Sequence, residues 1–176
     1  MENKVLEAIQ KRRSVRSFEE RIPDQNLIDE VMKAGLYAAS GRGTQGTVIV
    51  QIDNKKLGKE IRELNAKIGG WPANFDPFYS APVILIVLAN KNISTHVYDG
   101  SLVMGNLMLA ADAVGLGSCW IHRAKEEFET EQGKTWLKEW GLEGEWEGIG
   151  HLALGYAKGT KPQAAPRKEG RIITVK

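Results

Sequence analysis

Apolar residues recur along the first third of the chain at the three- and four-residue spacing of amphipathic helices. One such stripe predicts a short helix over residues 3–11, and a second predicts a helix from Pro23 to about Ser40. A third stripe, between Leu57 and Ile68, has Lys and Glu on its outer side and predicts another helix. All three are expected to cover a core with one face only.

Several segments have the pattern of β-strands. Residues 47–52 are rich in β-branched side chains, and residues 82–89, PVILIVLA, form a continuous apolar run between turn residues. A run of this kind is typical of a strand covered on both faces, so we place it at the centre of a sheet. Shorter strands are predicted over residues 118–121, 148–157 and 171–175.

The segment from Asp99 to Val114 is apolar nearly all round. A helix without a wide polar face must be buried, in a core or in a subunit interface. A weaker, charged helix is predicted over residues 125–140, and residues 158–170 are expected to be extended. This mixture predicts an α+β fold, and a length of 176 residues suits one domain over residues 1–176.

Composition narrows the functional classes. Apolar residues make up 42% and charged residues 26% of the chain, as in ordinary globular proteins. The single cysteine, Cys119, excludes an intramolecular disulfide framework and zinc sites built on paired cysteines. Residues 1–16 lack the apolar core of a signal peptide, and no apolar run has membrane-spanning length, so a cytoplasmic protein is expected.

Basic residues gather near the two ends of the chain, although the formal net charge is only +2. One cluster is Lys11 to Arg16, and the other contains Arg167, Lys168 and Arg171. The first cluster has two explanations: cations at a helix end interact favourably with the helix dipole, or guanidinium groups and a serine hydroxyl bind a phosphate. In the second case Arg167 and Lys168 would close the other side of the same anion site.

Two glycine-rich stretches resemble a dinucleotide-binding fingerprint. Gly41, Gly43 and Gly46 have the G-x-G-x-x-G spacing, but a helix precedes them and a strand follows, which is the reverse of the order that this motif requires. Residues 148–153 match a looser form and are followed by strand periodicity. A Rossmann site is therefore not expected.

Residues for metal binding or nucleophilic catalysis are scattered. His96, His122 and His151 have no carboxylate or cysteine at ligand spacing, so we expect no metal. The chain has no nucleophile-elbow pattern, and Cys119 lies in a predicted strand, where a buried, inert thiol is expected.

The order and spacing of several short motifs resemble the nitroreductase family of flavin mononucleotide (FMN) enzymes over nearly the whole chain. These motifs are Arg12-Arg13-Ser14-Val15-Arg16-Ser17-Phe18, Pro23-Asp24, Ala38-Ala39-Ser40 with Gln45, Ala81-Pro82, Asn106 to Ala111, Gly115 to Ile121, Gly155-Tyr156 and Pro166-Arg167-Lys168.

The resemblance implies an intertwined homodimer with FMN at the interface. Each subunit would have a central mixed, mainly antiparallel sheet flanked by helices, and the long apolar helix would pack against its symmetry mate. That packing would account for the all-round apolarity of residues 102–114.

The resemblance also implies a set of FMN-binding residues. Arg12, Ser14, Arg167 and Lys168 would hold the phosphate, Arg13 would line the same pocket, and Arg16 would lie at the pyrimidine side of the ring. The partner subunit would contribute Ser40, Gly41, Arg42, Gly43 and Gln45, and Asn74 would approach the ring edge. The segment Trp120-Ile121-His122-Arg123 would run beside the isoalloxazine and offer a backbone N–H to N5.

Some positions depart from the family pattern. Gly43 stands where an asparagine is common, and His122 and Arg123 stand where small or acidic residues are common, so an anionic acceptor or the phosphate of NADPH would be favoured there. The short insertion at residues 69–78 contains Trp71, Phe75 and Phe78, which could line an aromatic acceptor site or belong to the core.

The function implied is an FMN-dependent oxidoreductase. NAD(P)H would pass a hydride to flavin N5 and leave, and a nitroaromatic, a quinone or a similar small acceptor would then be reduced, which predicts ping-pong kinetics. No catalytic side chain is required, because the flavin supplies the chemistry. The alternatives are an FMN-binding protein for sensing or storage and, from the basic run alone, a nucleic-acid-binding surface. No RNP-like motif supports the latter, and neither a nucleic-acid nor a membrane partner is expected.

Overall fold

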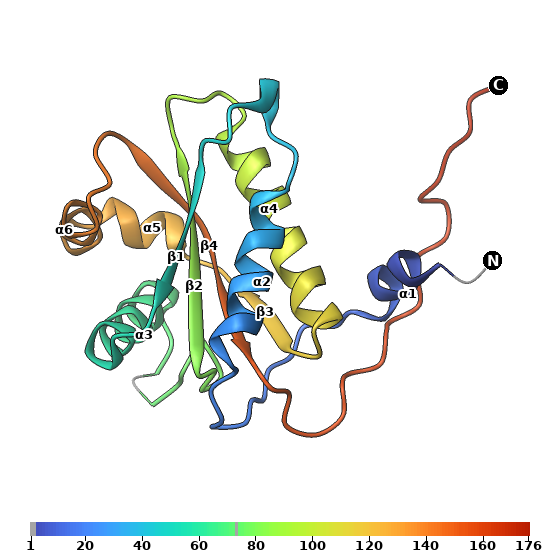
Figure 1. Cartoon of the computed structure of the whole chain (residues 1–176), viewed down its shortest axis with the longest axis horizontal. Coiled ribbons are helices and arrows are strands. Elements are labelled where there is room, and N and C mark those ends of the chain that lie inside the picture. The colour runs from blue at the N-terminus through green and yellow to red at the C-terminus, as the bar shows by residue number, and fades with distance from the viewer. Residues whose placement is uncertain (1–2, 73) are drawn as a thin grey trace.

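A four-stranded sheet with the order β1-β2-β4-β3 forms the centre of the molecule in the computed structural model, which describes residues 3–72 and 74–176 (Figure 1). All neighbouring strands in the sheet are antiparallel, and the described residues include one isolated parallel bridge, between Ser14 and Ser118. The mainly antiparallel α+β fold is therefore confirmed. The strands are β1 (Thr47–Ile52), β2 (Val83–Asn90), β3 (Gly117–Ile121) and β4 (Trp146–Gly155).

Helices cover both faces of the sheet (Figure 1). Helices α2 (Gln25–Leu36) and α4 (His96–Ala113) lie on one face, and α1 (Lys4–Lys11) lies on the outer side of this layer. The other face is covered by α3 (Lys55–Gly69), α5 (Ala124–Glu129) and α6 (Glu131–Glu139). In the described ranges, no helix is long and apolar enough to cross a membrane.

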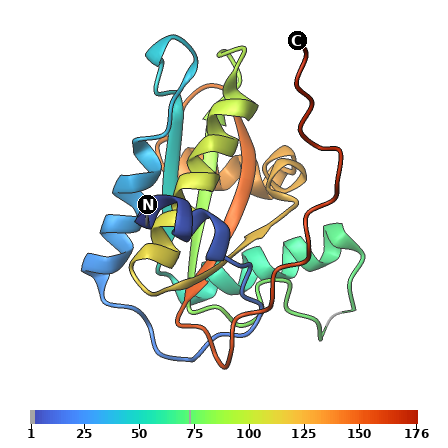
Figure 2. The same cartoon turned by 90° about the vertical axis from the view of Figure 1, so that its right-hand side faces the viewer.

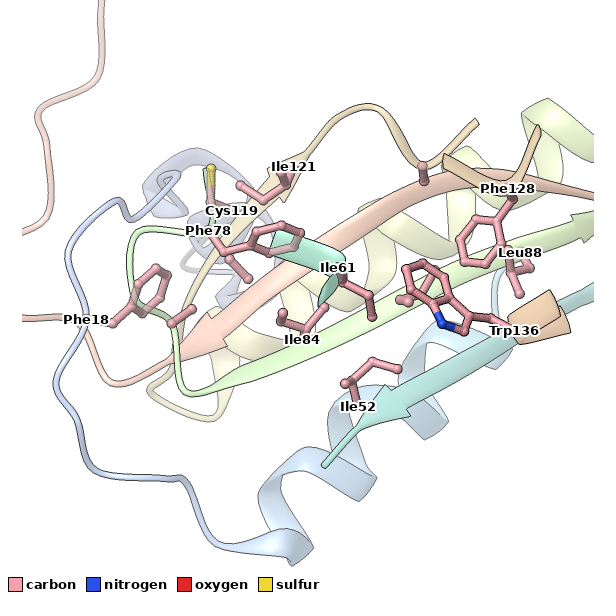
Figure 3. Close-up of a cluster of buried hydrophobic side chains, with 14 of the residues drawn as sticks. Phe18, Ile52, Ile61, Phe78, Ile84, Leu88, Cys119, Ile121, Phe128 and Trp136 are labelled. Carbon is pink, nitrogen blue, oxygen red and sulfur yellow. The ribbon is translucent and has the colours of Figure 1, made fainter. Parts of the chain in front are cut away.

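The central position of β2 is confirmed, because it pairs with β1 on one side and β4 on the other. Its side chains alternate between two separate cores: Ile84, Ile86 and Leu88 face the α3–α5–α6 layer, and Leu85 and Val87 face α2 and α4. In Figure 3, Phe128 and Trp136 lie near Leu88 at one end of the first core, and Phe18 lies at the opposite end.

Helix α4 is buried on one side only within the chain. Val103, Met104 and Leu107 are at most 3% exposed, whereas Leu102 and Tyr98 on the other side are 50% and 73% exposed. An apolar helix face of this kind on a folded chain is typical of a protein interface.

The single helix predicted over residues 125–140 is wrong, because two helices meet there at Thr130. The Thr130 hydroxyl accepts the N–H of Gly133 at 3.0 Å and so begins α6 as a new helix. A Cβ on Gly133 would come within 2.2 Å of the Glu127 carbonyl oxygen, so glycine permits this close turn.

Two helix boundaries and one predicted strand differ from the sequence pattern. The second helix ends at Leu36, four residues before Ser40, and α4 begins at His96 rather than Asp99. The strand predicted over residues 171–175 is wrong, because this part of the tail has no neighbouring strand, and its apolar side chains are at least 84% exposed. Lys161 holds the tail to Asp112 at the end of α4. Beyond β4 the chain runs past α1 and away from the sheet (Figures 1 and 2).

Candidate functional site

The basic segment, residues 12–16, is attached to the edge strand β3. The N–H of Val15 donates to the Ser118 carbonyl at 2.9 Å, and Ser14 bridges to the same residue. The Val15 side chain is buried against Gly117, where a Cβ would come within 2.9 Å of it. The basic segment is therefore a fixed part of the folded body rather than a mobile arm.

Two guanidinium groups in the basic segment have a buried nitrogen that forms no hydrogen bond with the described residues. Arg13 Nη1 donates to the carbonyls of Gln10 and Arg12 at 2.6 Å. However, Arg13 Nε and Arg12 Nη1 are buried and find no partner in the part of the chain that the structure describes. Unpartnered cationic donors are costly in a folded protein. Buried, unpartnered donors of this kind fit a bound anion that accepts several hydrogen bonds, such as a phosphate.

Cys119 lies directly beneath this group. Burial raises the pKa of its thiol, although the charge of Arg16, a hydrogen bond from Ser14 and the charge of Arg12 act in the opposite direction. The charges of Arg12 and Arg16 thus act on the same edge of β3 to which Ser14 is bridged. The buried thiol with a raised pKa agrees with the prediction of an unreactive cysteine.

A cavity of about 900 Å³ opens beside the basic segment. It brings together two residues that the resemblance places near the ring, Arg16 and Asn74. The other lining residues are Ser17, Phe18, Glu19, Glu20, Asp76, Tyr79, Ser80 and Lys158.

One wall of this cavity is a strained loop held by Asp76. Tyr79 and Ser80 have φ angles of 56° and 58°, in the left-handed region that residues other than glycine rarely adopt. The Asp76 carboxylate accepts the N–H of Ser80 at 2.7 Å and pairs with Arg62 at 2.6 Å. Strained loops held in this way cluster at functional sites.

The aromatic residues of the insertion divide into two groups; residue 73 lies outside the described residues. Trp71 and Phe75 are 52% and 38% exposed, and their ring centroids lie 5.2 Å apart. Phe78 is fully buried and packs edge-on against His151. Phe78 therefore belongs to the core, and only the other two remain available to a ligand.

The loop of residues 40–45 is a second strained region. Arg42, Gly43 and Gln45 have positive φ angles of 56°, 67° and 48°. The Ser40 hydroxyl accepts the N–H of Gln45 at 3.0 Å. The buried carboxylate of Asp99, in the first turn of α4, accepts the N–H of Gly41 at 3.0 Å. The loop is thus anchored to the N-terminal end of α4.

Within one chain, the loop of residues 40–45 and the basic segment lie at opposite ends of α4. The basic segment joins β3, which directly follows the C-terminal end of this helix. The 18 residues of α4 span about 27 Å, at about 1.5 Å per residue. The structure therefore does not bring these two groups of expected site residues together in one chain.

Trp120 and Ile121 form the end of β3. The Ile121 side chain is buried in the core, so only its backbone can face a ligand. The Trp120 ring lies over Gly150 of β4, where a Cβ would come within 2.2 Å of Nε1. This indole nitrogen is buried and unpartnered among the described residues.

His122 and Arg123 form the turn between β3 and α5, and both side chains are exposed. Arg123 has a φ angle of 80° and donates to Glu126 at 2.9 Å. Partial burial opposes ionisation of Glu126, but its backbone hydrogen bond, the bond from Arg123 and that residue's charge together lower its pKa. The ion pair between Arg123 and Glu126 offsets the positive charge that was expected at this turn. The His122 side chain is the other polar side chain of the turn.

Arg167 and Lys168 lie on the exposed tail. The Arg167 guanidinium donates to the carbonyl of Ala165, two residues earlier. Neither side chain forms a hydrogen bond with Arg12 or Ser14 in the described chain. The two basic clusters are thus not joined within this structure.

The sequence patterns did not identify a fully buried polar cluster next to the turn after β3. It contains Asn65, Glu127 and His151, each at most 1% exposed. The one available signal was the position of Asn65 on the apolar stripe of α3, four residues after Ile61 and one after Leu64.

Metal ligands do not assemble in this region. Residues 3–72 and 74–176 contain no group of three or more His, Cys, Asp or Glu side chains that could hold a metal ion. The Glu147 carboxylate already forms an ion pair with Lys125 at 3.4 Å, and His96 Nε2 lies 3.6 Å from the same oxygen.

A sequence model of the nitroreductase family matches residues 9–156. The chain belongs to the nitroreductase family. The matched range contains the basic segment, the loop of residues 40–45, Asn74 and the turn after β3. Arg167 and Lys168 lie outside it.

Relatives of this nitroreductase-family chain include a curated protein of Methanothermobacter thermautotrophicus with the provisional name NADH dehydrogenase/NAD(P)H nitroreductase. The two are 29% identical over 120 residues, which cover 66% of this chain and 59% of the relative. The match therefore spans less than two thirds of the curated relative.

Solved structures agree with the family fold over the full chain. A nitroreductase from Bacteroides fragilis with bound FMN is 25% identical, with a TM-score of 0.90 and coverage of 99% of this chain and 100% of that one. A nitroreductase from Desulfitobacterium hafniense with bound FMN is 23% identical, with a TM-score of 0.86 and complete coverage of both chains. The predicted nitroreductase-like fold is thus confirmed.

Proposed function

We propose that this chain is an FMN-dependent oxidoreductase of the cytoplasm, which takes electrons from NAD(P)H and passes them to a nitroaromatic, a quinone or a similar small acceptor. Residues 1–176 act as one FMN-binding domain, and two copies form a homodimer with FMN at the interface. The proposal is supported by the family match and by two similar structures that contain FMN.

The observation that carries the proposal is the pair of unpartnered guanidinium nitrogens in the basic segment. Arg12 Nη1 and Arg13 Nε are buried on either side of one peptide bond next to Ser14 in sequence, and have no acceptor in the described residues. A phosphate monoester supplies several acceptor oxygens for the unpartnered N–H groups and a negative charge that balances the guanidinium charges. These three residues would hold the FMN phosphate, and Arg167 and Lys168 would complete the site once the tail is ordered.

The ring of FMN would lie at the cavity beside Arg16 and Asn74. When bound, FMN supplies the hydride chemistry. Arg16 places a positive charge beside the cavity, and such a charge favours a ligand that gains electrons. The backbone of Trp120, Ile121, His122 and Arg123 would offer hydrogen bonds along the ring. The exposed rings of Trp71 and Phe75 would contact an aromatic acceptor.

A second copy of the chain would complete the site. Ser40, Gly41, Arg42, Gly43 and Gln45 lie about one α4 length from the basic segment of their own chain. The exposed apolar face of α4 offers a surface on which a partner could pack, and an antiparallel partner would bring its loop to this basic segment.

The test is an absorbance titration of the purified protein without oxygen. We expect flavin bands that bleach with NADH or NADPH and return when a quinone or nitroaromatic is added. Bound flavin that bleaches but returns only slowly would favour a sensing or storage protein. A colourless protein that takes up no added FMN would overturn the proposal.

A further inference from the structure

Three polar side chains are buried in the core that faces α3, α5 and α6. Asn65 is 1% exposed, and Glu127 and His151 are fully buried. Polar groups in a core cost stability unless they are hydrogen-bonded, and apolar side chains of similar size would avoid that cost. The position of this buried cluster next to the turn after β3 suggests a functional reason for its presence.

The three side chains form one continuous chain of contacts. His151 Nε2 lies 2.9 Å from Glu127 Oε2, a close contact in which neither atom forms a hydrogen bond among the described residues. The other oxygen of this carboxylate accepts a hydrogen bond from Asn65 Nδ2 at 2.5 Å. The same Asn65 nitrogen donates to the His122 carbonyl at 2.8 Å. One amide group thus joins the buried pair to the turn after β3.

This turn is held at two successive carbonyls. Asn65 binds the carbonyl of His122, and the Glu127 N–H donates to the carbonyl of Arg123 at 2.9 Å. Arg123 itself has a φ angle of 80°. A non-glycine residue keeps this conformation only where its surroundings enforce it. The buried cluster and the start of α5 supply that constraint.

Peptide geometry carries the constraint to the opposite side of the turn. The peptide bond between His122 and Arg123 is trans, so its C=O and N–H point in opposite directions. Because Asn65 fixes the carbonyl, the N–H of Arg123 points away from α3. Within residues 3–72 and 74–176, no acceptor receives this N–H.

The geometry points to Asn65 as a positioning residue that aims the Arg123 N–H at bound FMN, with Glu127 and His151 holding the Asn65 amide in place. This inference rests on the proposed function. It assigns a role to the buried cluster, which touches no ligand itself, and it makes the orientation of one peptide the feature that the cluster controls.

The test follows the amide hydrogen of Arg123 by NMR-detected hydrogen exchange, before and after addition of FMN. In the native protein we expect at least about tenfold slower exchange at Arg123 when FMN is bound, because the amide gains an acceptor. In Asn65→Leu we expect less than about a twofold change at Arg123, because the peptide is free to rotate. In Glu127→Gln, which keeps an acceptor for Asn65, most of the protection should remain.

Thr130→Val is the matched control. It removes the hydroxyl that caps α6 and that donates to the backbone carbonyl of Glu127 at 2.6 Å, and so weakens the same region. Neither bond involves Asn65 or the Glu127 carboxylate. Protection at Arg123 should therefore match the native protein.

Two outcomes overturn the inference: native protection in Asn65→Leu, or no FMN effect on the Arg123 amide of the native protein. The second measurement does not depend on whether the variant folds. A native protein that takes up no FMN overturns the proposed function as well, whereas FMN uptake with an unaffected Arg123 amide overturns the positioning role alone.

Discussion

The two basic clusters of this chain both contain arginine but have very different surroundings. The basic segment, residues 12–16, is bonded to β3 and half-buried, with guanidinium nitrogens already withdrawn from water. Arg167 and Lys168 lie on an exposed tail held to the body by the ion pair of Lys161 with Asp112. Folding has already restricted the guanidinium groups of the first cluster, whereas the exposed side chains of the second would lose conformational freedom on binding.

The largest expected effect is that of Arg12→Ala on FMN binding. The loss of a charge-assisted hydrogen bond from a preorganised group should weaken binding by about 1.5 to 3 kcal/mol. Fluorescence titration of the apoprotein with FMN measures this loss. Lys11→Ala is the control, because it removes the same charge from a side chain that is exposed and paired with Glu7. Equal effects of the two substitutions would contradict the phosphate role of Arg12.

Gly117→Ala tests whether the order of the basic segment depends on its contact with β3. The new Cβ would come within about 3 Å of the Val15 side chain and displace it, at a cost of roughly 1 to 2 kcal/mol of unfolding free energy. Urea denaturation measures this cost. Gly58→Ala, in α3, is the control, because its Cβ would meet nothing closer than 3.8 Å and should leave stability unchanged or raised. An unchanged midpoint in Gly117→Ala would show that the contact is not needed.

Arg167→Ala should weaken FMN binding by less than Arg12→Ala, by about 1 kcal/mol, because ordering the tail offsets part of the gain. The effect should also fall as salt rises, since this side chain is exposed. Titrations at low and high salt measure both. Arg171→Ala, on the same tail, should change FMN affinity by less than twofold, or about 0.4 kcal/mol. A loss as large as that of Arg12→Ala would mean that the tail is already ordered in the dimer.

The smallest effect concerns Cys119, beneath the basic segment. Burial raises its pKa above the ordinary value of 9.0 in the folded chain. Its contribution to stability is therefore complete below about pH 9 and is lost as pH rises from there toward the raised value. Denaturation from pH 7 to pH 10 should show a shallower decline in Cys119→Ala than in the native chain. Parallel declines would show that the thiol does not titrate differently on folding.

The sequence predicted those elements whose pattern is local. The run at residues 82–89 gave a central strand because both of its faces are apolar, and the stripes of α1 and α3 gave helices close to their observed bounds. The break at Thr130 was missed because a capping hydroxyl interrupts an otherwise helical pattern. The β-branched residues at 172–175 suggested a strand, but a strand also needs a neighbour, which local composition does not encode.

The sequence indicated candidate site residues that lie in local motifs, but not the contacts between residues far apart in the chain. The resemblance places Arg16 at the pyrimidine side of the flavin ring and Asn74 at the ring edge, and both line one cavity. The contact between Asn65 and the His122 carbonyl joins residues 57 positions apart, and no periodicity signals such a pair. The distance between the loop of residues 40–45 and the basic segment likewise follows from how α4 is placed in the fold, not from any motif.

The length of α4 has a genetic consequence for the proposed dimer. Each FMN site would draw its phosphate-binding residues from one chain and its loop of residues 40–45 from the other, because one helix holds the two apart. A chain damaged at Arg12 and a chain damaged at Gln45 would then complement one another when expressed together. Their heterodimer would contain one site with both defects and one site with neither, so two inactive alleles would restore activity that neither supports alone.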